Sequence, residues 1–137
     1  MEGRLSLKVV TKEKKIIDEY SDAVFLPGTT GEIGVLPGHT PLIAILDIGI
    51  LSYIKDGKKY FVGILEGIAE VLNDSVNVLA DEIIFEENIN EEEEKEELKK
   101  AEEILKYASF EEQEFARKSI KRALASFFLI KNSEKKF

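Results

Sequence analysis

His39 is the only histidine in the 137-residue chain. Histidine can act as an acid, a base or a metal ligand, so its side chain is the first candidate for chemistry. A metal site or a Ser-His-Asp arrangement would need further ligands or carboxylates, and none cluster around it in the sequence. The chain has no cysteine, which excludes thiolate zinc sites, cysteine nucleophiles and disulfides. We therefore expect a non-enzymatic protein without cofactor or metal, and we interpret His39 as a structural or interface residue.

Residues 27–41, PGTTGEIGVLPGHTP, form a glycine-rich stretch of the kind that can bind phosphate. The stretch lacks the Gly-Lys-Ser/Thr ending of a phosphate-binding loop, so we expect a loop and not a nucleotide site. Its apolar residues Ile33, Val35 and Leu36 lie among turn-forming residues, which places hydrophobic side chains near the tip of a domain. Two interpretations remain open: a docking surface, or packing of the loop on itself.

Charge is unevenly distributed along a chain whose formal net charge is −8. The acidic run at 91–97 falls where a helix is expected to begin, and acidic residues there oppose the positive helix end and face water. In the last segment, Arg117, Lys118, Lys121 and Arg122 form a basic stripe. This stripe is either a solvated face or a contact for an acidic partner. The negative net charge argues against nucleic-acid binding.

These residues must be positioned by two kinds of element, and the first two thirds of the chain has the pattern of short β-strands. Leu5, Leu7 and Val9 alternate with polar residues, and Asp56-Gly57 indicates a type I′ hairpin turn. Further apolar runs lie at 23–26, 42–46, 49–54, 60–65, 68–72 and 76–79. Strands this closely spaced predict a β-sandwich that ends near Phe85.

From about Asn90 the period becomes helical, and glycine and proline are absent. Ser109 and Glu112 form a capping box that predicts the start of a second helix. The expected apolar seams are Leu98, Ala101, Leu105 and Ala108 in the first helix, and Ala116, Ile120, Ala123, Phe127 and Ile130 in the second. The fold class is therefore an all-β N-terminal sandwich, residues 1–86, followed by an α-helical hairpin of two antiparallel helices, residues 87–137.

The most apolar stretch, residues 42–51, is interrupted by Asp47 and Gly49, so we expect no membrane span and membrane association only through a partner. The absence of cysteine favours a reducing, intracellular location. An unrelated sandwich adaptor with a coiled-coil tail would explain these periodicities, but not the motif within residues 31–42.

Three segments together resemble the epsilon subunit of bacterial F-type ATP synthases: GEIGVLPGHTPL at 31–42, GIAEV at 67–71 and VNVLAD at 76–81. The resemblance covers almost the whole chain and implies a sandwich followed by a helical hairpin. It implies a non-catalytic central-stalk subunit that binds the gamma subunit and the c-ring and couples ion translocation to ATP synthesis. The implied location is peripheral, on the cytoplasmic face of the bacterial inner membrane.

The resemblance also implies roles for particular residues. Glu32 matches an acid that faces the polar loops of the c-ring, and the implied contact with the c-ring or gamma comprises Glu32, Ile33, Gly34, His39, Pro41 and Leu42. In this family an extended hairpin inhibits ATP hydrolysis. Here Arg117, Lys118, Lys121 and Arg122 would then meet acidic residues of the alpha and beta catalytic subunits.

Some members of the family bind ATP in the hairpin, so a nucleotide-sensing module is the alternative function. Their motif is Ile-Asp-x-x-Arg-Ala with two arginines in the second helix. This chain has Asn90 in place of the aspartate, Glu93 in place of the first arginine, and Ser126 where an arginine follows Arg122. Because a carboxylate replaces a phosphate-binding cation, we expect ATP binding to be absent or very weak.

Overall fold

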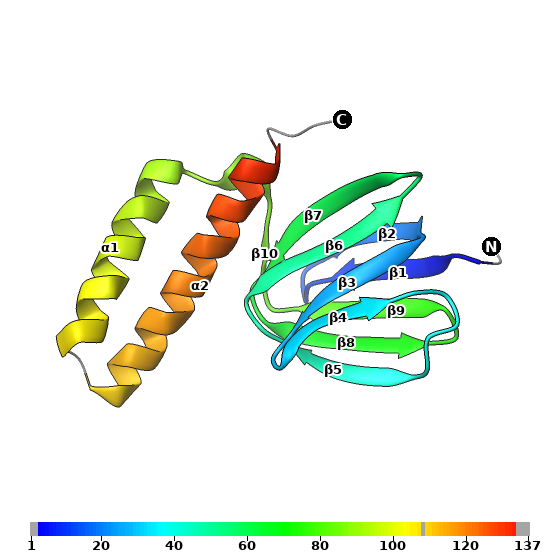
Figure 1. Cartoon of the computed structure of the whole chain (residues 1–137), viewed down its shortest axis with the longest axis horizontal. Helices are drawn as coiled ribbons and strands as arrows, with labels where there is room; N and C mark the ends of the chain where they lie inside the picture. The colour runs from blue at the N-terminus through cyan, green and yellow to red at the C-terminus, as the bar shows by residue number, and fades with distance from the viewer. Residues whose placement is uncertain (1–2, 108, 134–137) are drawn as a thin grey trace. The chain divides into compact units, whose positions relative to one another are not determined.

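The structure is a computed structural model that describes residues 3–107 and 109–133 (Figure 1). The chain divides into two compact units, Met1–Ile83 and Ile84–Phe137. The strands are β1 (Leu5–Val10), β2 (Lys15–Ser21), β3 (Ala23–Gly28), β4 (Gly31–Val35), β5 (Leu42–Leu46), β6 (Gly49–Lys55), β7 (Lys58–Ile64), β8 (Gly67–Leu72), β9 (Ser75–Ala80) and β10 (Ile83–Ile84). A 3-10 turn, η1 (Glu86–Asn88), precedes α1 (Glu91–Tyr107) and α2 (Phe110–Ser133).

The strands form one sheet in the order β10-β7-β6-β3-β5-β8-β9-β1-β2, with β4 paired to β3, and the sheet curls into a sandwich. Strand β3 joins the two layers, because it pairs with β6 through Ala23–Phe25 and with β5 at Gly28. The inward side chains form a fully buried core: Leu5, Leu7, Val9, Val24, Leu26, Val35, Leu51, Ile64, Ala69 and Val76. The predicted fold class, a sandwich followed by a helical hairpin, is confirmed.

Two tight turns set the register of their hairpins. Asp56 and Gly57 both have positive φ, 52° and 79°, as the predicted type I′ turn between β6 and β7 requires. Asn73 and Asp74, with φ of 51° and 59°, connect β8 and β9 in the same way. Leu72 therefore pairs with Ser75, and every second residue of β8 faces away from the core.

The glycine-rich stretch is not the loop that we expected, because its middle part is strand β4. A two-residue turn, Thr29-Thr30, folds β4 back on β3 with Gly28 opposite Gly31. Ile33 and Val35 are apolar residues at alternate positions, and Val35 is fully buried in the core. Of the apolar residues expected near a domain tip, only Leu36 is strongly exposed, at 61%.

The second unit is the helical hairpin, in which α1 and α2 pack against each other. Asn90 caps α1, since its Oδ1 accepts the Glu93 N–H at 3.2 Å, and Ser109 Oγ accepts the Glu112 N–H at 3.4 Å as the capping box predicted. Ala101, Ala116 and Ala123 of the expected seams are buried, whereas Leu98, Leu105, Ile120, Phe127 and Ile130 are half-buried. Ala108 lies outside the described residues.

Candidate functional site

The outer face of strands β5, β8 and β9 carries a row of exposed aliphatic side chains. Ile45 lies opposite Ile68, and Ile68 lies opposite Leu79, so the three side chains are direct neighbours across three strands. Their exposed fractions are 64%, 48% and 52%. Ile43 and Leu72, exposed at 71% and 42%, extend the patch on β5 and β8. We call these five residues the apolar sheet face.

The apolar sheet face lies on a rigid support. Each strand also directs small or branched residues into the core, where Leu46, Ala69 and Val78 are buried. The strands are joined by tight turns, and the core packs against one face of the sheet. The strands therefore have little freedom to rearrange and bury the aliphatic side chains on the other face. Exposed apolar side chains that gather on one face of a soluble protein mark a surface that binds another molecule.

A loop of residues 36–41 continues from this face and is held by the turn between β8 and β9. Asp74 Oδ1 accepts the N–H of Gly38 at 2.7 Å, and its carbonyl oxygen accepts the N–H of Ser6 at 2.8 Å. The N–H of His39 donates to the Leu36 carbonyl at 3.1 Å. Asp74 thus joins the loop to β1 and to the β8–β9 turn, which orders a segment that contains proline and glycine.

His39 is half-buried, and its Nδ1 donates to the Thr40 carbonyl oxygen at 2.6 Å. This hydrogen bond fixes the imidazole ring and leaves Nε2 as the atom available to a partner. Pro41 is exposed, and Leu42 begins β5 directly beside the apolar sheet face. These three residues are brought together at one end of β4.

The other candidate contact residues lie along β4 itself. Glu32 is exposed near the start of the strand, Gly34 is exposed beside the Phe25 ring, and Ile33 is half-buried on the inner face. An extended strand rises about 3.3 Å per residue, so Glu32 and the loop after Val35 are separated by roughly 10 Å or more. The structure therefore places Glu32 and His39 at opposite ends of β4 and not in one cluster.

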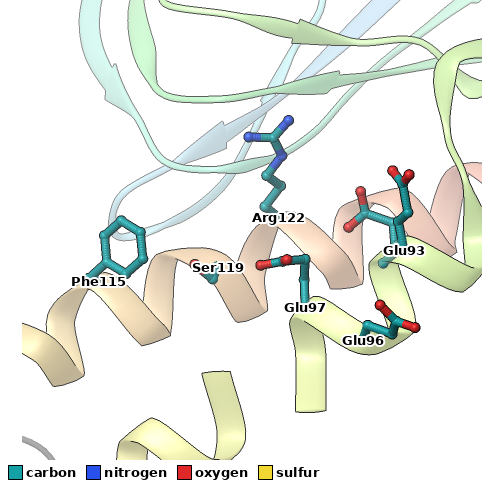
Figure 2. Close-up of a pocket in the computed structure, with 7 residues that line it drawn as sticks. Glu93, Glu96, Glu97, Phe115, Ser119 and Arg122 are labelled. Atoms are coloured by element: carbon teal, nitrogen blue, oxygen red, sulfur yellow. The ribbon is translucent and has the colours of Figure 1, made fainter. Parts of the chain in front are cut away.

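The hairpin has a groove of about 400 Å³ between its two helices (Figure 2). Helix α1 contributes Glu93, Glu94, Glu96 and Glu97, and helix α2 contributes Phe115, Ser119 and Arg122. A second groove of about 420 Å³ shares Phe115 and is lined by Ile104, Glu111 and Glu112 as well. The first groove thus holds four carboxylates and one guanidinium group.

Burial raises the pKa of the Glu94 carboxyl, and the neighbouring carboxylates of Glu97 and Glu93 raise it further, while the Arg122 guanidinium acts in the opposite direction. The groove is therefore an electrostatically negative environment that Arg122 compensates only in part. A triphosphate entering this groove would meet more negative than positive charge.

The four basic residues singled out in α2 are all exposed, but their surroundings differ. Arg117 forms an ion pair with Glu114 of its own helix. Arg122 lines the groove opposite the carboxylates of α1. The sequence pattern described a basic stripe, whereas in the structure Arg122 lines a groove together with carboxylates of α1.

Within the described residues, no group of three or more His, Cys, Asp or Glu side chains could hold a metal ion. In that same part of the chain, no helix is both long enough and apolar enough to cross a membrane. The surfaces described above can bind macromolecules by apolar contact and charge complementarity.

Comparison with known proteins identifies the family. Residues 4–86 match the family ATP synthase, Delta/Epsilon chain, beta-sandwich domain. The ATP synthase epsilon chain of Lawsonia intracellularis is 47% identical over 81 residues, which cover 59% of this chain and 61% of that protein. The ATP synthase epsilon chain of Geotalea daltonii is 40% identical over 115 residues, or 84% of this chain and 83% of that protein.

A solved structure supports the fold of the whole chain. A chain in the structure of the Euglena gracilis mitochondrial ATP synthase, OSCP/F1/c-ring, superposes with a TM-score of 0.82 at 23% identity, and the match covers 91% of this chain and 80% of that chain. The sandwich, the helical hairpin and the relatives in sequence agree with the resemblance that the segments 31–42, 67–71 and 76–81 together indicated. The chain belongs to the ATP synthase epsilon chain family.

Proposed function

We propose that this chain is a non-catalytic central-stalk subunit of an F-type ATP synthase. In this proposal its sandwich links the gamma subunit to the c-ring and so couples ion translocation to ATP synthesis. It associates peripherally with the cytoplasmic face of the bacterial inner membrane, through the complex alone. The observation that carries the proposal is the apolar sheet face, a row of exposed aliphatic side chains on a rigid sheet in a chain of this family.

The gamma subunit is assigned to the apolar sheet face and to the adjoining loop. Ile43, Ile45 and Ile68 offer aliphatic area that a partner helix can cover, and the loop ends in Pro41 and Leu42 beside them. Anchoring of the loop by Asp74 supports this assignment, because a pre-ordered loop loses little entropy on binding.

The c-ring is assigned to the start of β4, where Glu32 is exposed. Since β4 separates Glu32 from His39, the two ends of the strand can contact two different partners at once. A subunit that must connect two partners needs two such surfaces, and this separation supports the role of a link.

The hairpin is assigned a regulatory role, in which its extended form inhibits ATP hydrolysis through Arg117, Lys118, Lys121 and Arg122. The positive charge and exposure of these residues support contact with acidic residues of the alpha and beta subunits. The alternative function, nucleotide sensing by the hairpin, is disfavoured by the four carboxylates that line its groove.

Size-exclusion chromatography with the purified gamma subunit tests the proposal. We expect the full chain and a fragment of residues 1–86 both to co-elute with gamma, because the sandwich provides the contact. Circular dichroism verifies that the fragment is folded. If both folded proteins elute apart from gamma, the stalk function is wrong.

The regulatory role has a separate test. Deleting residues 87–137 from the assembled enzyme should raise its rate of ATP hydrolysis, since the inhibitory basic residues are lost. An unchanged rate of hydrolysis, in an enzyme that still assembles, would reject inhibition by the hairpin and leave the stalk function in place.

A further inference from the structure

Asp74 occupies a position of the β8–β9 turn for which glycine is the usual residue. Asn73 and Asp74 are the two central residues of this turn, and both have positive φ, 51° and 59°. Two-residue turns of this geometry favour Asn-Gly, because a Cβ atom makes left-handed backbone costly and glycine has none. For the turn conformation alone, aspartate is therefore less favourable than glycine at position 74.

The side chain of Asp74 makes a contact that glycine cannot make. Its Oδ1 accepts the N–H of Gly38 at 2.7 Å, across 36 positions of the chain. A hydrogen bond to a carboxylate is stronger than one between neutral groups. The main-chain carbonyl oxygen of Asp74 accepts the Ser6 N–H at 2.8 Å, which fixes the turn to β1. The carboxylate therefore holds Gly38 against a part of the sandwich that is itself fixed.

The loop of residues 36–41 is short, and both of its ends are fixed. It follows Val35, which is fully buried in the core, and it precedes Leu42, which pairs with β8. Gly38 lies in the middle of the loop and has a positive φ of 85°. A single bond from Asp74 to the middle of such a short loop therefore removes most of its remaining freedom.

We propose that Asp74 is a positioning residue for gamma binding: its carboxylate holds residues 36–41 beside the apolar sheet face in the conformation that the gamma subunit binds. Leu72 of the apolar sheet face is two residues before Asp74, so the same turn fixes the sheet face and the loop relative to each other. Because the free chain already holds the loop in place, gamma need not order it on binding, which lowers the entropic cost.

This inference rests on the proposed stalk function and adds a residue that belongs neither to the apolar sheet face nor to the loop. It also accounts for aspartate in the turn, since the residue that suits the turn best would leave the loop without its anchor. A positioning role predicts that partner binding weakens when the anchor is lost, while the sandwich stays folded.

Two neutral variants separate the hydrogen bond from the charge. Asp74→Gly removes the acceptor and gives the turn its preferred Asn-Gly sequence. Asp74→Asn also removes the negative charge, but it keeps an amide oxygen as an acceptor and a side chain that tolerates positive φ. We expect both variants to fold, with midpoints of thermal unfolding within about 6 °C of that of the original chain.

Residue-resolved hydrogen exchange of the free, full-length variants tests the anchor without any partner. We expect the Gly38 amide to exchange at least about fivefold faster in Asp74→Gly than in Asp74→Asn. The Ser6 amide is the internal control, because it donates to the main-chain carbonyl of residue 74, which both variants keep. Equal exchange of Gly38 in the two variants would overturn the proposal, and so would a loss of protection at Ser6, which would place the effect in the turn.

Fluorescence anisotropy of the labelled chain, titrated with purified gamma, tests the consequence for binding. We expect the Kd of Asp74→Gly to be at least about fivefold above that of Asp74→Asn, and the Kd of Asp74→Asn to lie within about threefold of that of the original chain. If the original chain binds gamma and the two variants bind it equally well, the positioning role is wrong while the stalk function stands. If the folded original chain does not bind gamma, both are wrong.

Discussion

The replacement Ile45→Thr tests the apolar sheet face directly. Threonine retains the β-branch that favours a strand, so the replacement changes the polarity of the face with little effect on local structure. Complete burial of an isoleucine side chain contributes about 1.5–3 kcal/mol. Because Ile45 is 64% exposed in the chain, a bound gamma subunit has about 1–2 kcal/mol of this left to gain. Loss of that contribution raises the Kd about 5–30-fold.

Ile45→Val is the matched control, since valine and threonine have nearly the same shape and differ only in that threonine has a hydroxyl where valine has a methyl group. Titration of the labelled chain with gamma, followed by fluorescence anisotropy, gives the Kd of each variant. We expect Ile45→Thr to bind gamma clearly more weakly than Ile45→Val does. The free energies of unfolding of both variants should lie within about 0.5 kcal/mol of that of the original chain. Unchanged affinity of Ile45→Thr would show that gamma binds elsewhere.

Three further predictions concern the hairpin. Ala116→Leu should destabilise it by about 1–3 kcal/mol in denaturant unfolding followed by circular dichroism, because Ala116 is fully buried and the added carbons overfill its site. Because burial raises the pKa of Glu94, its ionised form weakens the fold, and the free energy of unfolding of the hairpin should fall as the pH rises above about 4.5. Glu94→Gln removes the titrating group and should flatten this pH dependence. The same pH dependence in Glu94→Gln as in the original chain would contradict the burial argument. Calorimetric titration with ATP should show no binding tighter than about 1 mM, because the carboxylates of the groove repel the triphosphate, and micromolar binding would refute this.

Most of the sandwich was predictable because its signals are local. The Asp56-Gly57 turn and the alternation of Leu5, Leu7 and Val9 each depend on a few neighbouring residues, and the structure confirms both. Strand β4 was missed because glycine and proline dominate its surroundings and conceal the alternation of Ile33 and Val35. Pairing with β3 across a two-residue turn stabilises a strand that its own sequence supports only weakly.

The sequence contains an indication of the apolar sheet face. The segment Leu-Ile-Ala-Ile-Leu at 42–46 is apolar at every position, whereas a strand with one solvated face alternates. Such a run indicates that both faces of the strand are covered, either within the chain or by a partner. Only the cross-strand pairing could show that Ile45, Ile68 and Leu79 form one row, because their positions in the sequence give no register between strands.

In the helices, periodicity predicted only part of the buried surface. Heptad-like spacing located Ala101, Ala116 and Ala123, but it did not predict that Ala125, Ser126 and Leu129 would also be buried. Periodicity identifies one apolar face of a helix, and these additional residues lie on another face of α2. The burial of Ser126 has a further consequence, since an arginine at this position would have no room in this packing. Serine fits the space at position 126, although its Oγ is buried there without a hydrogen-bond partner.

Arg122 connects the electrostatics of the groove with the proposed regulation. In the hairpin described here, its guanidinium is the single cationic group among the residues that line the first groove, and it partly offsets the carboxylates around Glu94. In the proposed inhibitory state, the same guanidinium contacts acidic residues of the catalytic subunits. One side chain cannot serve both sets of carboxylates at the same time, so the two states compete for Arg122. If the hairpin inhibits as proposed, the negative charge of α1 favours the hairpin conformation described here over release of Arg122 to the catalytic subunits. Protonation of the carboxylates or screening by salt then weakens this preference.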